Sequence, residues 1–219
     1  MDASRKKIRV DVVSDIVCPW CFIGKRRLEA AIAARADRYE VAVHYHPFEL
    51  NPDLPAEGAD ARTHYARRFG SWERFVELRR RVAEVGRADG IDFAFDKATR
   101  APNTRRGHRL VWLARDTAAQ ADVVERLFAA HFLEGRDVGD VETLAGIAAE
   151  AGLDRAEVAA ALAGDAGAAE VEAAERRAHA LGVTGVPFFI VDGKWAVSGA
   201  QPVDAFVQLL DHAAGEPEA

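Results

Sequence analysis

Both cysteines of this chain lie in a single tetrapeptide, Cys18-Pro19-Trp20-Cys21. Two intervening residues suit a reversible disulfide at the first turn of a helix, and they also suit half of a zinc site. In a reducing compartment, a lone cysteine pair serves catalysis or metal binding more often than structural bonding. The rest of the sequence must therefore distinguish a redox site from a metal site.

Size and charge narrow the classes of function. The chain has 219 residues, a formal net charge of -6 and an ordinary share of hydrophobic residues, which predicts a globular protein of one or two domains. The negative charge argues against a nucleic-acid surface, because phosphate binding requires a basic field. No segment approaches the roughly 20 apolar residues of a membrane span, and the N-terminus has no signal-peptide-like apolar run. We therefore expect a cytoplasmic protein with neither a nucleic-acid nor a membrane partner.

The segments around the cysteines predict a βαβ unit. Residues 8–13 form a short apolar, β-branched run that is typical of a strand, and residues 40–48 alternate apolar and polar side chains as a second strand. Between them, the apolar spacing predicts a helix over about 20–36, with Pro19 in its first turn, where a missing N–H costs nothing. Strand, helix and strand of these lengths favour parallel strands with a right-handed crossover.

The C-terminal part predicts a hairpin followed by a helix. Residues 187–191 and 195–198 read as strands joined by the turn Asp192-Gly193, and Pro202 opens a helix that continues to Asp211. Six longer helices are expected in the 130 or so residues between the two parts, over 62–69, 72–88, 104–117, 122–133, 141–151 and 168–181. The chain therefore reads as βαβ, a helical block, then ββα.

Other side chains of the helical block have ordinary structural interpretations. Asn103 and Asp140 are predicted N-caps, and Asp154 is predicted to cap one more short helix. We expect three tryptophans in the core and two histidines as helix residues with satisfied hydrogen bonds: Trp72, Trp112, Trp195, His108 and His131.

The position of the first cysteine favours redox chemistry. Cys18 immediately precedes the predicted helix, so its sulfur faces unpaired backbone N–H groups and the positive end of the helix dipole. Thiols so placed ionise more readily, and the thiolate is the species that attacks a disulfide. We therefore predict that Cys18 is the nucleophile and that Cys21, one turn further along, resolves the mixed disulfide.

A second motif strengthens this interpretation through a family resemblance. Together with Gly185-Val186-Pro187-Phe188, the cysteine motif resembles the thioredoxin superfamily. Cys-Pro-Trp-Cys followed by Phe-Ile-Gly-Lys, with an inserted helical block, resembles the DsbA-like FrnE branch, which also includes 2-hydroxychromene-2-carboxylate isomerases and kappa-class glutathione transferases. The resemblance covers nearly the whole chain.

The resemblance implies a fold and an active-site loop. It implies a thioredoxin-like α/β fold in which residues 6–50 and 183–213 form one domain, residues 51–182 form an all-helical insertion, and residues 214–219 form a disordered tail. It further implies that Pro187 is cis and lies beside the nucleophile, with the Val186 backbone pairing with an extended substrate. Pro19 and Trp20 are expected to shape access to the sulfurs.

The predicted reaction is thiol–disulfide exchange with a protein or small-molecule disulfide. The alternative is a glutathione-dependent isomerase or transferase, although such relatives often carry serine where this chain has Cys18. A lesser alternative is zinc, which His44 and His46 could help to bind. No resident cofactor or metal is expected, glutathione is an optional co-substrate, and the oligomeric state, including a homodimer, stays open.

Two further residues have both a functional and a structural interpretation. Asp15, three residues before Cys18, could assist proton transfer to or from Cys21, or it could simply start the helix. Asn103 could contact substrate or glutathione, or it could act only as an N-cap.

Overall fold

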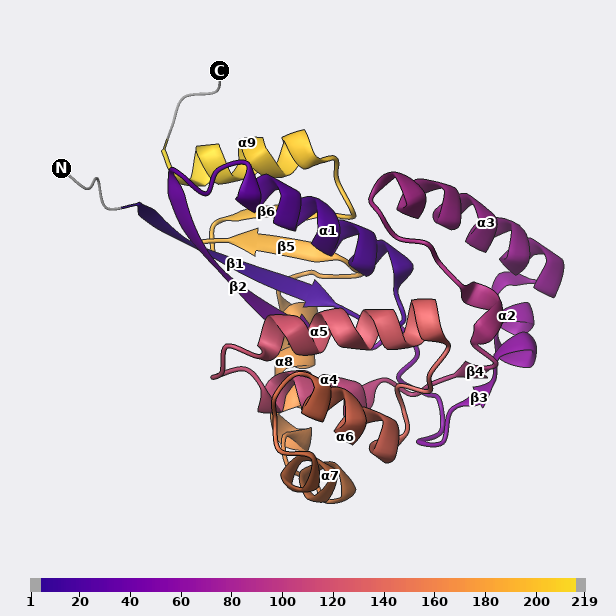
Figure 1. Cartoon of the computed structure of the whole chain (residues 1–219). Helices are drawn as coiled ribbons and strands as arrows, with labels where there is room; N and C mark the ends of the chain where they lie inside the picture. Colours follow the sequence, from indigo (N-terminus) through magenta and orange to yellow (C-terminus); the bar gives the residue numbers. More distant parts are fainter. Residues whose placement is uncertain (1–4, 216–219) are drawn as a thin grey trace.

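The N-terminal part forms the predicted βαβ unit. The computed structural model describes residues 5–215 and is shown in Figure 1. Strand β1 (Lys6–Ser14) is followed by helix α1 (Pro19–Ala33) and strand β2 (Tyr39–Pro47). β1 and β2 pair in parallel along their whole length, from Lys6 opposite Tyr39 to Ser14 opposite Pro47. The prediction of parallel strands is therefore confirmed.

The C-terminal part completes the same sheet. Strand β5 (Phe188–Val191) pairs antiparallel with β1, and strand β6 (Trp195–Ser198) pairs antiparallel with β5, which gives the order β2-β1-β5-β6. Helix α9 (Val203–Ala213) follows and packs on α1. Two segments separated by about 140 residues of chain thus share one sheet, and this sheet holds residues 18 and 186 near each other.

The alternating side chains of β1 build apolar layers on both faces of the sheet. Ile8, Val10 and Val12 belong to the main core, which also contains Phe22 of α1 and Phe206 of α9. Val13 points to the other face and packs in a smaller cluster, whose other buried members are Phe48, Ala178 and Val183. Because successive side chains of a strand point to opposite faces, one short strand supports both layers.

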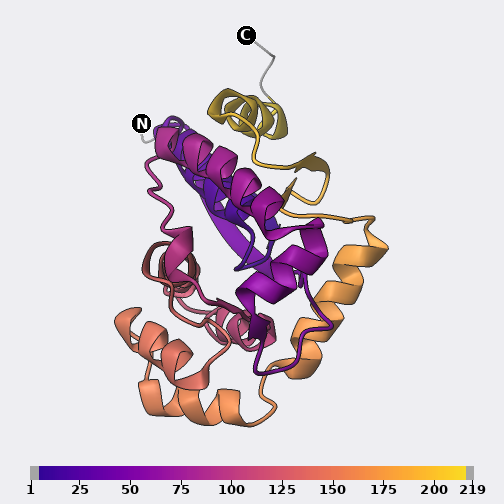
Figure 2. The same ribbon diagram turned by 90° about the vertical axis from the view of Figure 1, so that its right-hand side faces the viewer.

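The inserted segment is mainly helical. Its helices are α2 (Ala61–Phe69), α3 (Trp72–Ala88), α4 (Arg105–Leu113), α5 (Gln120–Ala129), α6 (Val141–Glu150), α7 (Arg155–Ala163) and α8 (Ala168–Ala180), with a 3-10 turn over Phe95–Lys97. The short strands β3 (Ala59–Asp60) and β4 (Arg100–Ala101) pair with each other. Helices α4, α5 and α8 contact β2, whereas α6 and α7 lie at the opposite end of the molecule from α9 in both Figure 1 and Figure 2.

Two of the predicted inserted helices differ from the expectation. The helix expected over 104–117 ends at Leu113, four residues early, and the next helix begins at Gln120, whose amide donates to Val111 O at 3.2 Å and ties the turn between them. This next helix widens into a π-helical turn over Ala130–Glu134. The turn ends at Gly135, which has a φ of 75° that suits glycine.

The predicted caps are confirmed at two of three positions. Asp140 and Asp154 each cap their helix, accepting hydrogen bonds from the N–H groups of the residue three positions on. The N-cap of α4, however, is Thr104 rather than Asn103. The Asn103 side chain instead accepts from Arg105 N at 3.0 Å and donates to Leu54 O at 2.8 Å, so it links the start of α4 to the loop before α2.

The division into domains with boundaries at 50/51 and 182/183 stays a prediction. Of the expected disordered tail, residues 216–219 lie outside the described residues, while α9 extends to Ala213. Within residues 5–215, no helix has the length and apolar character needed to cross a membrane.

Candidate active site

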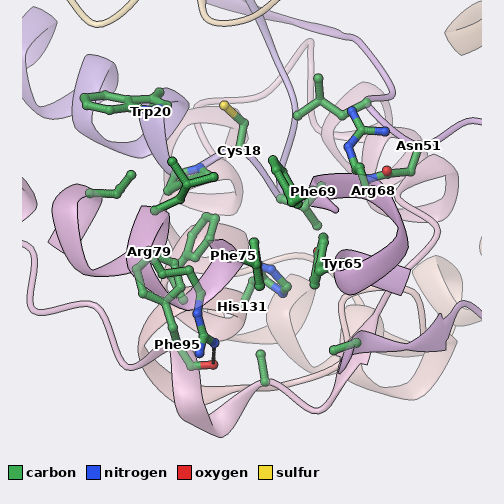
Figure 3. A pocket seen from close by; sticks show the side chains of 18 of the residues that line it. Cys18, Trp20, Asn51, Tyr65, Arg68, Phe69, Phe75, Arg79, Phe95 and His131 are labelled. Atoms are coloured by element: carbon green, nitrogen blue, oxygen red, sulfur yellow. Dashed lines mark hydrogen bonds between the residues drawn. The ribbon is translucent and has the colours of Figure 1, made fainter. Parts of the chain in front are cut away.

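Cys18 occupies the N-cap position of α1. Its backbone is extended (φ -95°, ψ 110°), and Pro19 follows as the first helical residue. The Cys18 N–H donates to Asp15 O and the Cys21 N–H donates to Cys18 O, both at 3.0 Å, which closes the tight turn into the helix. Figure 3 shows the Cys18 side chain at the edge of a cavity, with the exposed Trp20 ring beside it.

The loop before β5 lies against the Cys18 sulfur. The Cys18 thiol donates to the carbonyl oxygen of Val186 at 3.6 Å, and the Val186–Pro187 peptide bond is cis. Gly24 makes this close approach sterically feasible, since a Cβ there would lie 3.2 Å from Pro187 Cγ and 3.0 Å from Phe189 Cζ. A residue 168 positions away in the chain is thereby placed within hydrogen-bonding distance of the sulfur.

Cys21 is the inner member of the pair. Both cysteines are free thiols, and both are almost completely buried, at 5% exposed for Cys18 and 3% for Cys21. Burial raises the pKa of the Cys21 thiol well above its ordinary value, and the hydrogen bond and charge of Cys18 raise it further against opposing hydrogen bonds with Ser14 and the Asp15 backbone. Cys21 therefore keeps its proton in the resting pair.

Asp15 is fully buried and engaged in hydrogen bonds. One carboxylate oxygen accepts from Leu50 N at 2.7 Å, and the other lies 3.2 Å from Nε2 of His108 on α4. These contacts connect the segment before Cys18 to the chain after β2 and to the insertion. Both oxygens of the Asp15 carboxylate already have partners, Leu50 and His108. The role of Asp15 in proton transfer with Cys21 stays a prediction.

A cavity of about 460 Å³ opens beside Cys18. Its walls are mainly apolar, and most of the aromatic side chains in them come from the insertion, as Figure 3 shows for Tyr65, Phe69 and Phe75. Four arginines line it and no acidic side chain does: Arg68, Arg79, Arg81 and Arg100. A volume in this range suits a small molecule or part of a larger substrate.

Sequence reasoning missed this cavity. Trp72 was expected in the core and His131 was expected to have satisfied hydrogen bonds, yet both line the cavity. Within residues 5–215, the His131 ring has no hydrogen-bond partner, and it packs edge-on against the ring of Phe132, with 4.6 Å between centroids. The available signal was the aromatic spacing of residues 65, 69, 72 and 75, which places these rings on facing sides of α2 and α3.

Other residues singled out in the sequence lie elsewhere. Asn103 does not line the cavity, and Trp195 is 42% exposed rather than in the core, because β6 is the edge strand of the sheet. His44 and His46 lie on β2, with His46 Nε2 2.6 Å from Asp11 Oδ1, and both line a second cavity that excludes the cysteines. The described part of the chain contains no cluster of three or more histidine, cysteine or acidic side chains suited to a metal ion.

Comparisons with known proteins agree with this architecture. The family model described as a DSBA-like thioredoxin domain matches residues 9–211. A crystal structure of a probable DsbA oxidoreductase from Streptomyces coelicolor is 37% identical, with 97% of this chain and 92% of that chain covered and a TM-score of 0.84. The uncharacterised protein YwbO of Bacillus subtilis is 28% identical over 208 residues, or 93% of this chain and 96% of that protein.

More distant structures share the fold. The cytosolic disulfide reductase DsbM from Pseudomonas aeruginosa, solved with GSH, is 20% identical with a TM-score of 0.65, covering 94% of this chain and 99% of that chain. A 2-hydroxychromene-2-carboxylate isomerase is 17% identical with a TM-score of 0.69, covering 94% of each chain. Both the thioredoxin-like fold and the expected DsbA-like relationship are confirmed: the chain belongs to the DSBA-like thioredoxin domain family.

Proposed function

We propose that this protein catalyses thiol–disulfide exchange, with Cys18 as the nucleophile and Cys21 as the resolving thiol. The observation that carries the proposal is the position of Cys18, at the N-terminal end of α1 and 3.6 Å from the Val186 carbonyl oxygen. Cys18 lies at the helix N-terminus and at the cavity, whereas burial raises the pKa of the inner Cys21 thiol above its ordinary value and keeps it protonated. The two sulfurs are therefore unequal, as a directional exchange requires.

The reaction has two displacement steps. The Cys18 thiolate attacks one sulfur of the substrate disulfide, forming a mixed disulfide and releasing the other sulfur as a thiolate. Cys21 then loses its proton to solvent and attacks the Cys18 sulfur, which releases the second substrate thiolate. The substrate gains two electrons and the protein ends with a Cys18–Cys21 disulfide, and oxidation of a dithiol substrate follows the reverse steps.

The active-site loop offers a backbone surface to an extended substrate. The Val186 carbonyl points at the sulfur, so the segment before β5 can pair with a substrate strand while Cys18 attacks. Pro19 and Trp20 lie at the same cavity mouth and are the side chains that would limit access. These roles of Val186, Pro187, Pro19 and Trp20 are part of the proposal.

Regeneration of the reduced pair requires a thiol, and we propose glutathione as this co-substrate, in a cytoplasmic setting. The cytosolic disulfide reductase with GSH among the structural neighbours supports this part only by shared fold. No resident cofactor or metal enters the proposed steps.

The test is insulin disulfide reduction by the wild type and two variants, with glutathione as the reductant. Cys18→Ser should lose the activity, and Cys21→Ser should lose turnover but accumulate a mixed disulfide that mass spectrometry detects at Cys18. Equal rates for wild type and Cys18→Ser would reject the proposal. Stable glutathione binding to Cys21→Ser, with no disulfide reduction by the wild type, would favour the isomerase or transferase alternative.

A further inference from the structure

The cavity beside Cys18 carries an unused hydrogen-bonding group at its wall. His131 lies in the π-helical turn after α5, is 6% exposed, and lines the cavity. It has no hydrogen-bond partner within residues 5–215, and burial lowers its pKa to about 4, so the ring is neutral near pH 7. Figure 3 shows it among the aromatic rings below Cys18. Its ring nitrogens are not among the buried side-chain atoms that lack a partner, so they keep surface open to the cavity, where a polar atom of a ligand can pair with them.

The same cavity has an excess of positive charge. Arg79 lies 5.0 Å from the Trp72 ring centroid and 5.1 Å from that of Phe75, and its Nε is buried without a partner. Its terminal nitrogens donate to Phe95 O and to Asp96, whose side chain is almost fully exposed. Within the described residues, Arg68 forms no ion pair. Arg81 and Arg100 pair with carboxylates outside the cavity, Glu77 and Asp137.

The cavity wall therefore offers a ligand three kinds of interaction. The stacked rings of Tyr65, Phe69 and Phe75 offer a flat apolar surface, with centroids 4.3 Å and 5.1 Å apart along the stack. The arginines favour a negative charge, although the whole chain carries -6. His131 offers one neutral hydrogen-bonding atom. A phenylalanine or leucine side chain of a protein substrate would match only the first of these.

We propose that this cavity binds a low-molecular-weight aromatic anion that also carries a hydrogen-bonding group, and that the disulfide reduced at Cys18 is a small aryl disulfide of this class. The assignment of the substrate as an aryl disulfide rests on the proposed exchange function, whereas the proposed binding of the aromatic anion does not. The flat ring packs against the aromatic side chains that line the cavity, the carboxylate lies toward Arg68, and the polar atom pairs with His131. The Cys18 sulfur, at the edge of the same cavity, then faces the substrate disulfide.

The redox step is the exchange already described, with the reduced protein as the electron source. Cys18 bonds to one aryl sulfur and an arenethiolate leaves. Cys21 then displaces the second arenethiolate, so that two electrons pass from the dithiol to the aryl disulfide. An arenethiolate is a good leaving group because its thiol has a low pKa.

Binding is tested without redox chemistry. Calorimetry on the reduced wild type should show 6-hydroxy-2-naphthoate binding more tightly than 2-naphthol, which lacks the carboxylate, and than 2-naphthoate, which lacks the hydroxyl. Arg68→Gln should weaken the two acids about two- to five-fold and leave 2-naphthol unchanged. Arg67→Gln is the matched control, because Arg67 is also exposed on α2 but does not line the cavity, and it should have no effect.

The hydrogen-bond partner is tested with two variants. His131→Phe should weaken 6-hydroxy-2-naphthoate about five-fold or more, whereas His131→Gln, which retains a polar atom, should recover part of the affinity. Equal binding of the three naphthalenes, or no binding of any at millimolar concentration, would overturn the inference. Binding of N-acetyl-phenylalaninamide as tight as that of 6-hydroxy-2-naphthoate would also overturn it, by indicating a peptide side chain as the occupant.

Kinetics then test the substrate class. The rate of oxidation by 5,5'-dithiobis(2-nitrobenzoate), an aryl disulfide dianion, is compared with that by neutral 4,4'-dithiodipyridine, each normalised to dithiothreitol. A preference for the dianion that falls in Arg68→Gln and not in Arg67→Gln supports the inference. Oxidation by both without preference overturns the inference while the exchange function stands. Binding of the naphthoates with no reaction at Cys18 overturns both the substrate class and the exchange function.

Discussion

Nε2 of His108 lies 3.2 Å from Oδ1 of Asp15, and this buried pair joins the inserted helix α4 to the turn that leads into Cys18. Asp15 is fully buried and His108 nearly so. Burial lowers the pKa of His108, but the hydrogen bond and charge of Asp15, together with Glu175 and Glu49, outweigh it and raise the pKa above its ordinary value. The insertion is thus tied to the active-site segment by a charged contact as well as by apolar packing.

Replacing His108 should destabilise the protein in a pH-dependent way. In His108→Leu, which has no side-chain donor, the Asp15 carboxylate keeps only the hydrogen bond from the Leu50 amide, and loss of one partner of a buried pair costs about 3–5 kcal/mol. Because the folded-state pKa is raised, the stabilisation is complete below the unfolded value near 6.5 and disappears as pH rises through the folded value. Urea unfolding should therefore show a larger loss at about pH 6 than at about pH 9, and equal losses would contradict the charged pair.

The buried His131 should make the protein sensitive to acid. Its folded-state pKa of about 4 lies below the ordinary 6.5, so its contribution is complete above about pH 6.5 and is lost as pH falls toward 4. At about 1.4 kcal/mol per pKa unit, the loss approaches about 3 kcal/mol. His131→Gln has no such titration, so its unfolding free energy should fall less than that of the wild type between about pH 7 and pH 4. Parallel losses in the two proteins would show that His131 is not buried as a neutral group.

The buried ammonium of Lys25 should make its partner Glu125 important for stability. Lys25 Nζ, on α1, donates to Glu29 at 2.5 Å and to Glu125 on α5 at 2.7 Å, and its side chain is 3% exposed. Glu125→Ala leaves this charge with one partner and should cost about 1–3 kcal/mol in unfolding free energy.

A second substitution, Lys25→Met, tests whether the lost stability comes from the Lys25–Glu125 ion pair or from lost packing. Adding Lys25→Met to Glu125→Ala removes the buried charge that is left with Glu29 alone and fills a similar volume, so part of the lost stability should return. If the double variant is as unstable as the sum of the two single variants, the ion pair is not the cause.

Gly24 should be intolerant of even a methyl group. A Cβ at this position meets Phe189 Cζ at 3.0 Å and Pro187 Cγ at 3.2 Å, and Phe189 is fully buried, so the loop beside Cys18 must move. Alanine normally stabilises a helix by about 1 kcal/mol relative to glycine, but here the steric clash should outweigh that gain. Gly24→Ala should therefore be less stable than the wild type and should reduce insulin more slowly.

The matched control is a glycine in an open helical position. At Gly146 in α6 the nearest atom to a new Cβ is Arg136 Nη2 at 3.5 Å, which is ordinary contact. Gly146→Ala should raise the unfolding free energy by up to about 1 kcal/mol and leave the insulin assay unchanged. Thermal unfolding that responds equally at both positions would show that the contact between α1 and the Pro187 loop is not tight.

Local sequence was sufficient to predict most helices and strands, but it was insufficient to predict where some of them end and what they contact. The helix over 72–88 was predicted with its observed bounds, because its N-cap and apolar spacing are both local signals. The cap of α4 was wrong by one residue, since Asn103 is held by Leu54 in a distant loop. His131 was misread because a helical histidine has the same local pattern whether its ring meets a protein partner or a cavity.

By itself, the sequence determined the redox-type cysteine pair, its position at a helix start, the strands and helices around it, and their family pattern. Those features arise from residues within a few positions of one another, where backbone geometry and side-chain periodicity act directly. Only the tertiary structure decided that Val186 meets Cys18, that Asp15 meets His108, and that Tyr65, Arg79 and His131 enclose one cavity. Those relationships depend on the packing of separate elements, up to 168 residues apart in the chain, which no local pattern records.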